Sequence, residues 1–128
     1  MNYEISFHND GTIILVTHKA DFDLGRDMQA VGAELIAILE PAERPLALIM
    51  DVRDVRLDFG SIVAAMAAST RDSSDVFGHP NLGQFVFITE NSLVRLAAKA
   101  FAQEQYGGIH VSVAATLEEA LASIAVEA

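Results

Sequence analysis

A short stretch of the chain alternates acidic and basic side chains directly after the apolar run 46–50: Asp51, Arg53, Asp54, Arg56 and Asp58. In open α/β sheets, ligands bind beyond the carboxyl ends of the strands, and Mg²⁺ needs only one or two protein carboxylates. The two arginines can instead neutralise the acids directly, because charge runs at a surface commonly form solvated ion pairs. We therefore predict a salt-bridged loop here and assign no metal.

Ser61 follows Gly60 at the expected start of a helix. A phosphate on Ser61 would meet unpaired backbone N–H groups and the positive end of the helix dipole. These features make Ser61 a candidate regulatory phosphorylation site. Serine is also a common N-cap residue, and capping alone explains its position without any modification. Both interpretations stay open.

The sequence contains no pattern that is typical of a metal site, a nucleotide site or a catalytic site. The histidines lack metal-binding spacing and are interpreted as ordinary surface or edge residues: His8, His18, His79 and His110. The chain has no cysteine, and it shows neither a phosphate-binding glycine loop nor a nucleophile elbow. We predict no catalytic residue, no cofactor and no metal, and hence a protein that is not an enzyme.

Apolar runs bounded by turn residues predict the strands, which are expected over residues 3–8, 12–18, 46–50, 85–89 and 110–113. Helical periodicity predicts four helices, over about 24–40, 60–68, 92 to about 106, and from 117 onwards. Asn9-Asp10-Gly11 is a turn signal that joins the first two strands into a hairpin. The order β-β-α-β-α-β-α-β-α predicts an α/β fold with a single mixed, mostly parallel sheet of about five strands. The hairpin is expected at or near one edge, helices on both faces, and residues 1–128 in one domain.

Capping residues support the helix boundaries. Thr116 and Glu119 have the spacing of a capping box. Asn91 is expected to cap the helix that begins at residue 92, and either Asp21 or Asp23 to cap the first helix.

The overall charge of the chain argues against some classes of binding partner. The formal net charge is −10, from 18 acidic and 8 basic residues. Such a surface repels phosphate backbones and anionic lipid, so we expect no nucleic-acid partner and no membrane partner. No apolar stretch approaches the roughly 20 residues of a membrane span, and residues 1–10 are unlike a signal peptide. We therefore expect a soluble, cytoplasmic protein.

The element order and the segment 48–69 resemble the STAS fold, the family of anti-sigma-factor antagonists and sulphate-transporter regulatory domains, and the SpoIIAA-like bacterial proteins. In that family an apolar strand leads into Asp-Leu-Ser-Gly-Val, two variable residues, Asp-Ser-Ser-Gly-Leu-Gly and a helix. Residues 51–55, Asp-Val-Arg-Asp-Val, stand where the first part would be, and Ser61 falls at the family's second serine. The family's Asp, first serine and following glycine are replaced by Phe59, Gly60 and Ile62.

The closing half, FVFITENSLVRLAAKAF followed by TLEEALASI, is also similar to the SpoIIAA-like proteins. The resemblance implies a non-enzymatic regulatory or protein-interaction module of anti-sigma-factor antagonist type. Its partner would be a kinase or an anti-sigma-like regulator, and a partner kinase would phosphorylate Ser61.

The expected helix 60–68 has almost no polar face. A helix that is apolar all round is buried all round, so its outer side needs a cover. A second copy of the chain, in a homodimer, or a partner protein would cover a surface formed by Asp58, Gly60, Ser61, Ala64 and Ala67. The alternative is a small-molecule or lipid-binding domain with an apolar pocket between this helix and loop 69–84. Alanine is also simply the best helix former and is tolerated in water.

Overall fold

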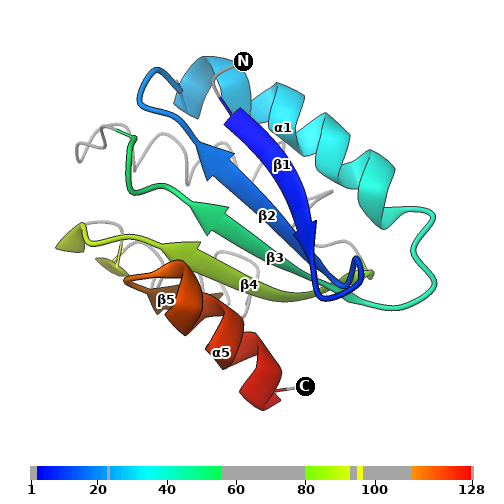
Figure 1. Cartoon of the computed structure of the whole chain (residues 1–128). Helices are drawn as coiled ribbons and strands as arrows, with labels where there is room; N and C mark the ends of the chain where they lie inside the picture. The colour runs from blue at the N-terminus through cyan, green and yellow to red at the C-terminus, as the bar shows by residue number, and fades with distance from the viewer. Residues whose placement is uncertain (1–2, 23, 56–79, 93–94, 97–110, 128) are drawn as a thin grey trace.

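The protein is built around one five-stranded sheet, in which the strands follow one another in chain order (Figure 1). The computed structural model describes residues 3–22, 24–55, 80–92, 95–96 and 111–127. The strands are β1 (Tyr3–His8), β2 (Ile13–His18), β3 (Leu46–Asp51), β4 (Leu82–Ile88) and β5 (Val111–Ala114). β1 runs antiparallel to β2, and every other neighbouring pair is parallel. The predicted α/β class, the mixed and mostly parallel sheet and the hairpin at its edge are confirmed.

The hairpin turn uses backbone conformations that few residues tolerate. Asn9, Asp10 and Gly11 have positive φ angles of 51°, 57° and 84°. Asparagine, aspartate and glycine are the residues that enter this region most readily. The Gly11 N–H donates to the His8 carbonyl at 3.2 Å, which closes the predicted turn.

Helix α1 (Leu24–Leu39) covers one face of the sheet. Its buried residues Val31, Leu35 and Leu39 pack against alternate residues of the central strands, among them Ile14 and Leu48. The Tyr3 hydroxyl on β1 donates to Glu34 Oε2 at 2.5 Å, which fastens the edge strand to the helix. α1 ends just before Pro41, as predicted, since proline cannot continue a helix. Asp23, one of the two expected caps, lies outside the described residues.

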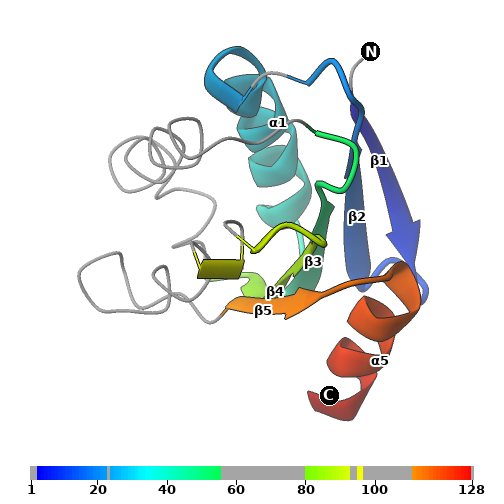
Figure 2. The same cartoon turned by 90° about the vertical axis from the view of Figure 1, so that its left-hand side faces the viewer.

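Helix α5 (Leu117–Glu127) covers the opposite face, over β3, β4 and β5. Figure 2 shows α1 and α5 on the two sides of the sheet. Ala120 and Ile124 are buried against Ile49, Val86 and Ile88, and the expected contacts of Leu117 and Leu121 are present as partly buried side chains. Helices on both faces are confirmed for the part of the chain that the structure describes.

The sequence places the start of β4 too late. The strand was expected at residue 85, and it begins at Leu82, which pairs with Leu46. A Cβ atom on Gly83 would lie 3.0 Å from the Pro45 Cβ, so glycine allows these two segments of the chain to approach closely. In a sequence, glycine suggests a loop. Here Gly83 lies within a strand, at a point where another part of the backbone comes close.

The two middle helices predicted from the sequence fall mostly outside the described residues. Helix 60–68 does so entirely. Of the segment from residue 92 to about 106, Ser92, Arg95 and Leu96 are described, and all three are helical.

Candidate functional site

The carboxyl ends of the parallel strands bring polar residues from distant parts of the chain to one edge. His18 ends β2, Asp51 ends β3, and Thr89 follows β4. In the strand register Thr17 pairs with Asp51, and Asp51 pairs with Ile88, so the three chain segments lie side by side. Ligands in open α/β sheets bind at this edge, and we take it as the candidate site.

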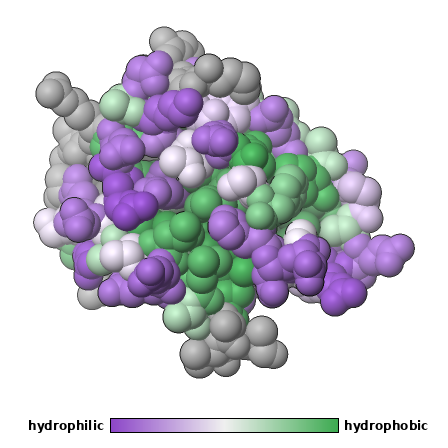
Figure 3. Space-filling model, viewed as in Figure 1, coloured by the Kyte–Doolittle hydropathy of each residue, from purple (hydrophilic) through white to green (hydrophobic). Residues whose placement is uncertain are grey.

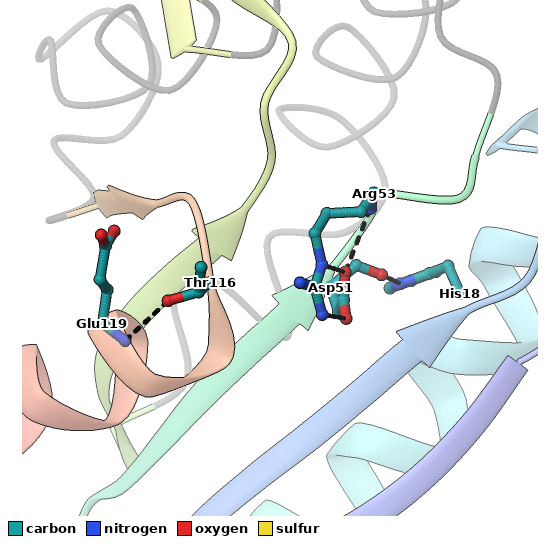
Figure 4. Close-up of polar contacts among 5 residues, drawn as sticks. All are labelled: His18, Asp51, Arg53, Thr116 and Glu119. Carbon is teal, nitrogen blue, oxygen red and sulfur yellow. Dashed lines mark hydrogen bonds and ion pairs between the residues drawn. The ribbon is translucent and has the colours of Figure 1, made fainter.

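His18 is enclosed by the fold as fully as Thr89, and each has 1% of its surface exposed. Its Nδ1 lies 3.0 Å from the backbone carbonyl oxygen of Asp51 (Figure 4). A carbonyl oxygen can only accept, so Nδ1 carries the hydrogen. The Phe22 ring meets the imidazole edge-on, at 4.5 Å between centroids. Burial lowers the pKa of His18, and this effect exceeds the opposing influence of Asp51, so the buried ring is held neutral.

The burial of His18 corrects its interpretation as an ordinary surface or edge histidine. The side chains of Ile14 and Val16 belong to the core beneath α1. Strand alternation places residue 18 on the same face. The missed signal was therefore the period of two in β2, which marks residue 18 as inward-facing although it ends the strand.

Asp51 and Arg53 form a tight ion pair beside His18. The Arg53 Nε donates to Asp51 Oδ1 at 3.0 Å, and Nη2 donates to Oδ2 at 2.7 Å. The Arg53 backbone N–H adds a third bond to Oδ1, at 3.1 Å. Partial burial raises the pKa of Asp51, but the hydrogen bonds and charge of Arg53 together outweigh it, and the net pKa is lowered. The carboxylate is therefore ionised and occupied by the arginine.

This pair confirms the salt-bridged loop for Asp51 and Arg53. The next acid, Asp54, is exposed. Arg56 and Asp58, the other members of the alternating stretch, lie outside the described residues.

Thr89 connects β4 to the segment that follows. Its backbone N–H donates to the Ala114 carbonyl at 2.9 Å, and its Oγ1 accepts from the Asn91 N–H at 3.0 Å. The Asn91 carbonyl then accepts from the Arg95 N–H at 3.2 Å, which is the first bond of a helix. The start of a helix after Asn91 is confirmed. The buried Thr89 hydroxyl, which holds the connection between β4 and this helix, was not predicted from the sequence.

The capping box at the start of α5 is present with one shift. The Glu119 N–H donates to Thr116 Oγ1 at 3.1 Å, as predicted (Figure 4). The Glu119 carboxylate, however, accepts from the N–H of Ala115 at 3.0 Å, one residue before the expected Thr116. Two otherwise unpaired donors are still satisfied, so the box performs its usual structural role.

Most of the other sequence candidates fall outside the part of the chain that the structure describes. Ser61, Asp58, Gly60, Ala64 and Ala67 lie outside the described residues, as do His79 and His110. His8 pairs with Ile13 at the turn end of the hairpin, and His18 pairs with Tyr3 at the other end, so these two histidines are far apart.

Two hollows lie at the opposite edge, near the hairpin turn. One, of about 660 Å³, is lined by the turn and the connection from α1 to β3, including Gly11, Glu43 and Arg44. The other, of about 360 Å³, lies between the strand starts and α5, and includes Ile13 and Ile124. On the face that α5 covers, apolar side chains gather in the middle and hydrophilic ones border them (Figure 3). The first hollow includes the predicted turn Asn9-Asp10-Gly11, and the described lining of both hollows includes none of the predicted site residues.

Within the described residues, no helix is long and apolar enough to cross a membrane. No protein-family model matches the chain, and a search of curated proteins finds no match either.

Proposed function

We propose that this chain is a cytoplasmic, non-enzymatic regulatory or protein-interaction module of the STAS, anti-sigma-factor antagonist type. The proposal includes four helices: α1, α5, helix 60–68 beyond the described residues, and the helix from residue 92, of which three residues are described. Its partner is a protein kinase or an anti-sigma-like regulator, and Ser61 is the residue through which the partner acts.

The observation that carries the proposal is the order and direction of the strands. An antiparallel hairpin at one edge is followed by parallel strands in chain order. This is the arrangement expected from the element order that resembles the family. It also places the start of the segment with the family resemblance, 48–69, in β3, which ends at Asp51.

The chemistry of the carboxyl edge also favours a non-enzymatic role. The His18 imidazole is neutral and hydrogen-bonded to the backbone. The Asp51 carboxylate is occupied by Arg53, and the Thr89 hydroxyl accepts from the backbone of Asn91. These contacts hold neighbouring strands and their exits in place. Side chains that are held by such contacts suit an edge that presents the following segment to a partner.

The test uses purified full-length chain and anti-sigma-type kinases from the same genome. Binding is measured by calorimetry with and without ATP, and phosphate transfer is read by intact mass and peptide mapping. We expect one phosphate on Ser61 and weaker binding after transfer, because the added charge alters an apolar contact surface. Ser61→Ala should bind without accepting phosphate, and Ser61→Asp should bind weakly.

The control is Ser92→Ala, which removes an exposed hydroxyl at the start of a different helix. Ser92→Ala should bind and accept phosphate like the parent chain. If no kinase binds, or if phosphate arrives elsewhere, the regulatory proposal fails. Saturable binding of a lipid or apolar small molecule, competing with no protein, would instead support the ligand-binding alternative.

A homodimer through helix 60–68 is part of the same proposal. Ala64→Glu or Ala67→Glu would place a charge in that contact and should weaken the dimer, as measured by light scattering after size exclusion. Unchanged dimer mass in both variants would place the contact elsewhere.

A further inference from the structure

The outer edge of β1 is a second surface, whose backbone groups pair with no described strand. Among the described strands, β1 pairs with β2 alone. Helix α1 appears beside β1 in Figure 1, but Figure 2 shows that it lies against one face of the sheet. An edge strand carries a row of backbone donors and acceptors that point outward and can pair with another chain. Natural edges are commonly protected by lysine, proline or a bulge. β1 has neither lysine nor proline, and it pairs with β2 without a bulge over its whole length.

The side chains of β1 make this edge suited to contact. Phe7 is 53% exposed although it is a large apolar residue. The formal charge of the strand comes from Glu4 alone, while the whole chain carries −10. β1 is therefore a place where two copies of an acidic protein can meet with little repulsion, because charges beyond about 8 Å are screened at physiological salt.

We propose that β1 pairs antiparallel with β1 of a second copy, about a two-fold axis at Ser6. A two-fold axis perpendicular to the sheet keeps each face of one copy continuous with the same face of the other. Facing residues must then belong to the same face of the strand.

This condition restricts the register. Tyr3, Ile5 and Phe7 share the face beneath α1, and Glu4, Ser6 and His8 share the other, since side chains alternate. Residues that face each other must therefore be both odd or both even in number. The axis can pass only through a residue, and near the middle of the strand it passes through Ile5, Ser6 or Phe7.

Chemistry selects the axis at Ser6. There Glu4 faces His8 of the other copy twice, and the imidazole donates to the carboxylate. On the other face, Ile5 covers the exposed Phe7 of the other copy. An axis at Ile5 sets Glu4 opposite Ser6, and an axis at Phe7 sets Ile5 opposite the turn. Only the Ser6 axis joins an acid to a histidine and an apolar residue to Phe7 at the same time.

The pairing is expected to be weak, because the surface area that it buries is small. A stable complex buries on the order of 1,000 Å² in total, and the strand pairs of residues 4–8 alone bury less. We expect a dissociation constant on the order of 100 µM, independent of helix 60–68. The inference does not rest on the proposed regulatory function, and Ala64→Glu should leave this pairing unchanged.

The first experiment is sedimentation equilibrium of the Ala64→Glu chain, in which the separate helix contact is weakened, at concentrations that span about 100 µM. Glu4→Lys sets lysine opposite His8, and His8→Glu sets two acids face to face. Each should weaken the dimer about tenfold, since the hydrogen bond between the acid and the imidazole is lost at two symmetric places. The double variant Glu4→Lys with His8→Glu should restore it, because lysine then faces glutamate at both places. Ser112→Lys, on the other edge of the sheet, is the matched control and should change nothing.

The second experiment locates the axis. The chain has no cysteine, so a single introduced cysteine reports only on itself. In the Ser6→Cys variant the two thiols face each other across the axis, and facing Cβ atoms approach the separation that a disulfide needs. Under mild oxidation we expect Ser6→Cys to form a covalent dimer faster than Ile5→Cys or Phe7→Cys.

Four results would overturn the proposal. The first is a monomer throughout the concentration range, and the second is loss of pairing in Ser112→Lys but not in Glu4→Lys. The third is a double variant whose dimer is no stronger than that of the single variants. The fourth is cross-linking that is fastest at residue 5 or 7.

Discussion

The His18 imidazole is bonded to the backbone carbonyl of Asp51, with 3.0 Å between Nδ1 and the oxygen. This contact ties the end of β2 to the end of the parallel strand β3, and the Asp51 side chain beyond it is held by Arg53. One residue therefore contributes its backbone to a buried histidine and its carboxylate to an arginine. The stability of the carboxyl edge should depend on both contacts, in ways that pH and substitution can separate.

His18 should make the fold sensitive to mild acid. Burial lowers the pKa of the folded imidazole, whereas in the unfolded chain the pKa is about 6.5. As the pH falls below about 6.5, the unfolded chain takes up a proton that the folded chain does not. The free energy of unfolding should then fall, by up to about 1.4 kcal/mol per pH unit. Urea unfolding between about pH 7.5 and pH 5.5 measures this slope.

The variant His18→Asn keeps a donor near Nδ1 and removes the titrating ring. It should be less stable than the parent at neutral pH and should lose most of the slope. His8→Asn, at the far end of the hairpin, is the control and should retain it. An equal slope in the parent and in His18→Asn would show that another group is responsible.

Arg53 should contribute modestly to the free energy of unfolding, and mainly at pH values at which Asp51 is ionised. Because the net pKa of Asp51 is lowered in the fold, its stabilising contribution is present above the unfolded pKa of about 3.9 and is lost as the pH falls through the folded pKa. The Arg53 side chain is 39% exposed, so solvent screening limits the pair to at most about 1 kcal/mol. Arg53→Gln should lower the free energy of unfolding by that amount at pH 7, and the difference should shrink below about pH 4. Asp54→Asn, in the same loop, should change stability by less than about 0.5 kcal/mol at pH 7. A loss in Arg53→Gln that persists undiminished at low pH would rule out the ion pair as its cause.

The fold was predictable because its signals are local and repeated. The five apolar residues of β3 are all buried, as a strand covered on both faces requires. Turn residues with positive φ, the proline after α1 and the hydroxyl before α5 each mark a boundary through their own conformational preference. These features need no knowledge of distant contacts.

The carboxyl edge was only partly predictable, because its groups meet through the sheet. The pair of Asp51 and Arg53 is local and was expected. The bond from His18 to Asp51 joins residues 33 positions apart, and no short pattern encodes it. Asn81 illustrates the same limit, since the sequence places it only within the expected loop 69–84. Its side chain instead closes the end of a helix about 40 residues earlier.

Asn81 should be required for the junction between α1 and the sheet. Its Nδ2 donates to the carbonyls of Leu39 and Ala42, at 2.8 Å and 3.0 Å. Carbonyls at the end of a helix lack partners within the helix. Asn81→Ala should therefore lower the free energy of unfolding by about 1–3 kcal/mol, as measured by urea denaturation.

Asn81→Asp distinguishes the hydrogen bonds from the shape of the side chain. Aspartate has nearly the same size, but it would set a carboxylate against two carbonyl oxygens. It should be at least as destabilising as alanine at pH 7, and partly recover when protonated at low pH. Equal stability of Asn81→Asp and the parent chain at pH 7 would contradict the assigned role of the amide.

The cap of α5 should behave as a coupled pair. Thr116 Oγ1 accepts from the Glu119 N–H, and the Glu119 carboxylate accepts from the Ala115 N–H. Thr116→Ala should lower the free energy of unfolding by about 1 kcal/mol, as for other N-cap losses. Glu119→Ala should cost a similar amount, because a donor and a favourable charge at the helix start are both affected. Both bonds order the same turn, so the double variant should cost about 0.5 kcal/mol less than the sum of the two single variants.

The matched control for this cycle is Glu118→Ala. Glu118 is an exposed acid in the same first turn of α5, so its removal takes away the same charge near the helix dipole. The difference between Glu119→Ala and Glu118→Ala therefore isolates the bond to Ala115, and we expect about 0.5–1 kcal/mol. Thermal and urea unfolding of the four chains of the cycle, together with Glu118→Ala, give these values. Identical losses for Glu118→Ala and Glu119→Ala, with additive effects in the double variant, would reduce the cap to a charge effect, because a hydrogen bond specific to Glu119 would then contribute nothing measurable.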